Sequence, residues 1–170
     1  MIKPIIAGML AALVLTGCAA LVKTASGHPH DYPEARSYTV SEDADAEVDA
    51  ALARAAENGK RVMLVIGANW CHDSRALAGW LGTERFAALI SERYELVFVN
   101  VGMPQSGDGH NIAIAQRFGL SKLPGTPNLL VLTAQGRSVN ADTATSWRNA
   151  ASRDEDSIYA ELERLSKQPV

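Results

Sequence analysis

Three short runs of apolar, mostly β-branched residues, separated by segments with helical spacing, limit most strongly how this chain can fold. The runs are 61–67 (RVMLVIG), 95–101 (ELVFVNV) and 128–133 (NLLVLT). Runs of this kind are typical of strands covered on both faces. Helical spacing is predicted for 41–58, 74–80, 83–94, 111–118 and 154–166. This alternation predicts an α/β layer fold in which at least two neighbouring strands are parallel.

The connections between these segments are marked by glycine and proline. Residues 102–109 (GMPQSGDG) predict a loop with a turn at Asp108-Gly109, and 134–137 predict a second turn. Gly59 and Gly119 are expected to end the helices that precede them. No repeat or long linker interrupts the pattern, so the organisation is a leader, a tether and one domain.

Length and charge exclude some classes of protein. With 170 residues, 47% of them hydrophobic, the chain has room for one domain of ordinary size. A net charge of -3 offers no basic excess to neutralise phosphates, so we expect no nucleic-acid partner. We expect a monomer without a bound cofactor or metal.

The first 17 residues have the three parts of a signal peptide. Lys3 is the basic part, residues 4–15 are apolar, and Leu15-Thr16-Gly17 precedes Cys18. The apolar part has about 12 residues, whereas a membrane-spanning helix needs about 20. An uncleaved anchor with a chance cysteine is the alternative.

The tetrapeptide that ends at Cys18 resembles the bacterial lipobox. The resemblance implies that Cys18 is lipidated on sulfur and becomes the first residue of the mature chain, anchored in a membrane of the cell envelope. At about 0.8 kcal/mol per buried methylene, two or three acyl chains hold a protein almost permanently. Ala19 follows the cysteine. In comparison with Gram-negative lipoproteins it favours the outer membrane over the inner one, on the periplasmic face.

Residues 18–42 are expected to form the lipidated N-terminus and a tether, and 43–168 the folded domain. The tether mixes proline, glycine and charges without periodicity. His28, His30 and Asp31 could bind a metal, although two histidines in such a segment are more often part of a solvated linker.

Cys71 is left as the one free thiol if Cys18 is lipidated, because the chain has two cysteines. It follows the first predicted strand and precedes a predicted helix. The unpaired N–H groups and the dipole at a helix N-terminus favour a thiolate, and an exposed thiolate is nucleophilic. A buried, inert cysteine is the alternative.

Residues 69–75 (NWCHDSR) resemble the active-site signature of the thioredoxin family, Trp-Cys-x-x-Cys at a strand-to-helix junction. Gly125-Thr126-Pro127, just before the third strand, resembles the family's cis-proline turn, so we expect a cis Thr126–Pro127 bond. The resemblance covers about residues 46–166. It is closest to periplasmic thioredoxin-like proteins with Trp-Cys-x-Asp-Cys-Arg, of which Asp73 and Arg75 are kept. It implies a thioredoxin-like fold, with a central mixed sheet flanked by helices.

Two departures from that family change the expected chemistry. Ser74 stands where the resolving cysteine should be, and Val65 stands where many thioredoxins carry a buried aspartate. The resemblance therefore implies monothiol exchange or isomerisation, with Cys71 as nucleophile and Ser74 able to stabilise its thiolate. Trp70, His72, Thr126 and Pro127 would bind the substrates, which are exported proteins or small thiols and disulfides.

Other interpretations of the same residues stay open. The domain could be a binding module that holds exported proteins without turnover, or Cys71, His72 and His110 could deliver a metal. Trp70 could line a groove beside Cys71 or belong to the core. Asp73 would stabilise the first turn of the helix and yet oppose a thiolate nearby.

Overall fold

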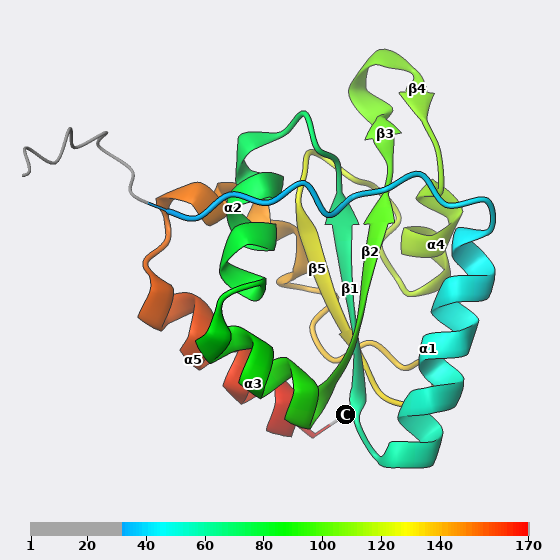
Figure 1. The fold of residues 1–170 in the computed structure, drawn as a ribbon. Helices are drawn as coiled ribbons and strands as arrows, with labels where there is room; N and C mark the ends of the chain where they lie inside the picture. Colours follow the sequence, from blue (N-terminus) through cyan, green and yellow to red (C-terminus); the bar gives the residue numbers. More distant parts are fainter. Residues whose placement is uncertain (1–31, 170) are drawn as a thin grey trace, which may run out of the picture.

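A three-stranded mixed sheet lies at the centre of the computed structural model, which describes residues 32–169 (Figure 1). The strand order is β2-β1-β5. The central strand β1 (Arg61–Gly67) runs parallel to β2 (Tyr94–Asn100) and antiparallel to β5 (Asn128–Leu132). The predicted α/β fold with a mixed sheet is confirmed.

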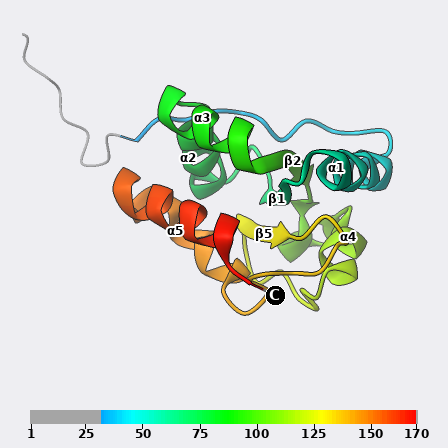
Figure 2. The ribbon, with the colours of Figure 1, turned by 90° about the horizontal axis from the view of Figure 1, so that it is seen from below.

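Helices cover both faces of this sheet. Figure 2 shows α1 (Ala44–Asn58) and α4 (Ile112–Arg117) on one side. On the other side lie α2 (His72–Leu81), α3 (Glu84–Arg93) and α5 (Glu155–Lys167). The sheet is therefore the middle layer of three, as expected for strands whose residues are apolar on both faces.

Alternate residues of β1 point into two separate apolar clusters, because successive side chains of a strand point to opposite faces. Met63 and Val65 face α2, α3 and α5, whereas Leu64 and Ile66 face α1 and α4. Val65 stands at the position where many thioredoxins carry a buried aspartate, and it is a fully buried part of the apolar core.

The ends of α1 follow their local sequence. The Asp43 carboxylate accepts a hydrogen bond from Ala46 N at 2.9 Å, and Gly59 ends the helix with a φ of 75°, a conformation that favours glycine.

The predicted loop 102–109 is a small hairpin, and the turn predicted at Asp108-Gly109 is wrong. Strand β3 (Gly102–Met103) pairs with β4 (Asp108–Gly109) around a 3₁₀ turn, η1 (Pro104–Ser106). The chain reverses at Gly107, which has a φ of 90°. Gly107 and Gly109 are both possible turn residues in the sequence, and only the pairing of β3 with β4 decides that the chain reverses at Gly107.

A second segment without a predicted element also has regular structure. Between β5 and α5 the chain forms a 3₁₀ segment, η2 (Ala144–Ser152), which packs on α2 and contains the fully buried Trp147.

Residues 32–42 are not a free tether. The segment passes from beside α2 to the start of α1, across the carboxyl-terminal half of β2 (Figure 1). Tyr38 is 1% exposed, and its ring meets that of Phe98 edge-on with centroids 5.2 Å apart. The prediction that the tether extends to residue 42 does not hold for residues 32–42. A segment without periodicity can still be held against the domain by one buried aromatic side chain, here Tyr38.

The predicted signal peptide (residues 1–17) and Cys18, His28, His30 and Asp31 lie outside the described residues. Between residues 32 and 169, the structure has no helix of the length and apolar character needed to cross a membrane.

Candidate active site

Cys71 is the N-cap residue of α2, at the end of the short loop that follows β1. Its backbone N–H donates to Ala68 O at 3.2 Å, and its carbonyl accepts from Arg75 N at 3.1 Å. Helix α2 begins at His72, two residues earlier than predicted, so the thiol stands at the positive end of the helix. The residue is free and 8% exposed.

The loop before β5 reaches Cys71 from a distant part of the sequence. The thiol donates a hydrogen bond to Thr126 O, with Sγ and the oxygen 3.2 Å apart, and the Thr126–Pro127 bond is cis. Since a carbonyl oxygen only accepts, this hydrogen bond exists only while Cys71 carries its proton. The structure therefore brings together Cys71, Thr126 and Pro127.

Ser74 lies beneath the loop and is fully buried. Its hydroxyl accepts from Ala68 N at 3.5 Å, and its carbonyl accepts from the Tyr38 hydroxyl at 3.3 Å. A Cβ on Gly67 would lie 2.7 Å from Ser74 Oγ and 2.8 Å from a ring carbon of Tyr38, so only glycine fits there. Burial raises the pKa of Tyr38, which therefore stays a neutral donor.

Asp73 links the first turn of α2 to η2. Its Oδ1 accepts from Ala151 N at 2.8 Å, and His72 Nε2 lies 3.1 Å from its Oδ2. The carboxylate is mostly buried, whereas the imidazole is exposed. The main contact of Asp73 is thus a structural one to another part of the chain, and His72 is the member of the pair that a substrate can reach.

Arg75 clamps the loop that carries Cys71. Its Nη1 donates to Asn69 O at 3.2 Å and to Trp70 O at 3.1 Å. The other side of the guanidinium forms two hydrogen bonds with the Glu34 carboxylate, at 3.1 and 3.3 Å, and these raise the pKa of Arg75.

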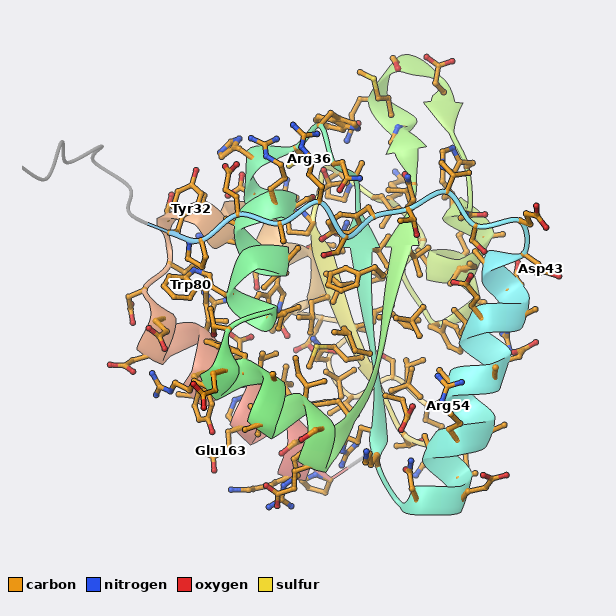
Figure 3. All side chains as sticks on the ribbon, viewed as in Figure 1. Tyr32, Arg36, Asp43, Arg54, Trp80 and Glu163 are labelled. Carbon is orange, nitrogen blue, oxygen red and sulfur yellow. The ribbon has the colours of Figure 1, made fainter. Side chains whose placement is uncertain are left out.

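The segment before α1 is tied to this loop by further contacts that sequence reasoning missed. The Asn69 side chain pairs with the backbone of Tyr38, accepting at 3.2 Å and donating at 2.8 Å. Arg36 donates to Asn69 O at 3.4 Å, and Figure 3 shows its side chain at the end of the molecule where β1 and β2 end. No local signal marks these residues, because their partners are more than 30 positions away.

Trp70 is 49% exposed, so it is not a core aromatic residue. Its indole N–H donates to Gly102 O in β3 at 2.8 Å, which fixes the ring against the β3–β4 hairpin. The side chain forms a firm apolar surface next to the thiol.

Cys71, His72 and His110 do not form a metal site in the described part of the chain. Across residues 32–169, no group of three His, Cys, Asp or Glu side chains is close enough to hold an ion. His110 lies at the base of the hairpin. Its backbone N–H donates to Val101 O at 3.2 Å, and its ring lies beside Gly102.

Comparison with known proteins agrees with this geometry. Residues 43–134 match the model of a family described as thioredoxin-like. The chain is also similar to a solved structure, the disulphide isomerase from Xylella fastidiosa Temecula1, with 30% sequence identity and a TM-score of 0.68. The match covers 78% of this chain and 100% of the isomerase chain. A search of curated proteins gave no match.

Proposed function

Since the chain belongs to the thioredoxin-like family, we propose that it carries out thiol–disulfide exchange with Cys71 as its single nucleophile. The observation that supports this most is the position of the thiol at the start of α2, against Thr126 O and beside a cis proline. The similar structure is named as a disulphide isomerase, which is the same class of chemistry.

The exchange needs no electron acceptor beyond the substrate disulfide. Cys71 loses its proton and the hydrogen bond to Thr126 O, and the N–H groups of the first turn of α2 stabilise the thiolate. The thiolate attacks one sulfur of the substrate. A new S–S bond joins it to Cys71, the old S–S bond breaks, and the departing thiolate takes up a proton.

Release then requires a second thiol from outside the site, because Ser74 occupies the resolving position. A thiol of the substrate itself gives isomerisation, and a separate thiol gives reduction. Trp70, His72, Thr126 and Pro127 would bind the substrates, which are exported proteins or small thiols and disulfides. Ser74 would act from beneath the loop, through the backbone that positions Cys71.

We also propose that the domain works at the periplasmic face of a membrane of the cell envelope, held by lipid on Cys18. This proposal rests on the resemblance of residues 15–18 to a lipobox. Ala19, the residue after the cysteine, favours the outer membrane over the inner one.

A binding module without turnover is the second candidate, and one observation favours it. The Cys71 thiol is mostly covered and is engaged by Thr126 O, as an inert cysteine would be. In that case the same surface would hold partners, and no covalent complex would form.

Trapping of mixed disulfides separates the two candidates. Wild-type protein, mixed with a disulfide-bonded exported protein under mild oxidation, should accumulate complexes linked through Cys71, and Cys71→Ala should abolish them. Ser74→Cys should shorten their lifetime and raise turnover, because residues three apart in a helix are neighbours. Ser91→Cys, which adds an exposed thiol on α3, is the control and should change neither the lifetime of the Cys71-linked complexes nor their turnover. Absence of any Cys71-linked complex from the wild type would favour the binding module.

A further inference from the structure

The β3–β4 hairpin is the part of the site that the proposed function does not yet use. We infer that this hairpin makes the site selective for polypeptides with an apolar side chain beside the reacting cysteine, over small thiols and disulfides. The inference rests on the proposed exchange at Cys71 and specifies its substrate class.

Each side of the junction between the hairpin and the active-site loop carries one exposed apolar side chain. Trp70 is 49% exposed and Met103 is 45% exposed. Trp70 immediately precedes Cys71, and its indole N–H bonds to Gly102 O, the carbonyl next to Met103 in the chain. Together Trp70 and Met103 form what we call the apolar platform. Of the large apolar side chains between residues 32 and 169, only Val40 is also exposed.

The base of the hairpin holds the platform in place. Gly102 N donates to Asn100 Oδ1 at 2.9 Å, and Gly102 has a φ of 59°. A Cβ at this position would lie 2.4 Å from Asp108 O and 2.7 Å from the His110 ring, so the two strands approach as closely as glycine allows. Figure 1 shows the hairpin rising past the ends of β1 and β2, at the same end of the molecule as the start of α2. A surface fixed before binding loses less conformational entropy when a ligand packs on it.

The chemistry of the platform favours an apolar polypeptide side chain. Burial of apolar surface contributes about 25 cal/mol per Å², and a thioether adapts to side chains of different shape. A small hydrophilic thiol presents little apolar area, so the platform adds little to its binding. The exchange at Cys71 is the same for both, and the difference lies in how firmly the disulfide is held next to the thiol.

Competing model disulfides test this selectivity. The probes are two short peptides whose single cysteine is disulfide-linked to 2-mercaptoethanol, identical except for leucine or serine beside the cysteine. Hydroxyethyl disulfide is the small probe. With wild-type protein, the rate constant for forming the Cys71 mixed disulfide should be about fivefold higher for the leucine peptide than for the serine peptide.

Substitutions of Met103 test whether the hairpin causes the difference in rate between the leucine and serine peptides. Met103→Ser should clearly lower the leucine-to-serine ratio, because it removes one of the two side chains of the platform, whereas Met103→Leu should keep the wild-type ratio. Val40→Ser removes a more exposed apolar side chain, 81% exposed, from outside the site and should leave the ratio as in wild type.

The outcomes are distinguishable from failure of the proposed function. If wild-type Cys71 reacts with hydroxyethyl disulfide but shows equal rates with both peptides, the selectivity inference is overturned and the exchange function stands. A ratio that persists in Met103→Ser also overturns it. If Cys71 reacts with none of the three probes, the proposed function fails, and the inference fails with it.

Discussion

Replacing Tyr38 tests whether the segment before α1 is part of the fold and of the site. The side chain is almost fully buried, packs edge-on against Phe98 and donates from its hydroxyl to Ser74 O at 3.3 Å. Its backbone is paired with the Asn69 side chain in the loop that leads to Cys71. Tyr38→Phe removes the hydroxyl alone, and Tyr38→Ala removes the ring as well.

The two variants should differ several-fold in their effect on the free energy of unfolding. A buried aromatic residue replaced by alanine typically costs about 3–5 kcal/mol, because the apolar burial is lost and a cavity remains. A single neutral hydrogen bond contributes about 0.5–1.5 kcal/mol. Since the bond from Tyr38 is long at 3.3 Å, we expect about 0.5–1 kcal/mol for Tyr38→Phe.

Urea unfolding followed by tryptophan fluorescence measures both values. Val40→Ala is the matched control, because Val40 lies two positions away in the same segment and is 81% exposed, so its loss should cost less than about 0.5 kcal/mol. Tyr38→Ala should also speed alkylation of Cys71, since the loop above Tyr38 loses its support. A cost for Tyr38→Ala no larger than that for Val40→Ala would refute the reasoning and return the segment to the role of a tether.

Three further perturbations address other parts of the molecule. Asp73→Ala leaves the Ala151 N–H without its acceptor, so urea unfolding should show a loss of about 1–3 kcal/mol; an unchanged midpoint would contradict the link between α2 and η2. A hydrogen bond from Arg54 holds the pKa of Glu95 below its ordinary value of 4.5, so the stability that this carboxylate contributes is present above that value and is lost as the pH falls through the lower folded pKa. The stability difference between wild type and Glu95→Gln should therefore shrink in acid, and a difference independent of pH would contradict this. Cys18→Ser should leave the membrane fraction, and membrane pelleting like wild type would oppose the lipoprotein proposal.

Much of the fold could be predicted from the sequence because the signals are local. The run at 61–67 is apolar on both faces, which by itself predicts a buried strand. Gly59 can take the left-handed conformation that ends α1, which by itself predicts the end of that helix. The position of Cys71 at a helix start follows from the strand before it and the helical spacing after it. The turn at Thr126-Pro127 was identified by its resemblance to a family motif, which also predicted its place beside the thiol.

Tertiary structure alone decided which polar groups support that thiol. Asp73 bonds to a backbone N–H 78 positions away, Trp70 to a carbonyl 32 positions away, and Arg75 to a carboxylate 41 positions away. Periodicity reports which face of an element is buried, and it carries no information about which distant backbone group will stand opposite a given side chain. Tyr38 shows the same limit, because its segment has no periodicity and its burial depends on the path of the chain across β2. The sequence by itself therefore determined the three central strands and most of the helices, and it singled out Cys71 as the candidate nucleophile, whereas the packing of distant segments determined what surrounds that thiol.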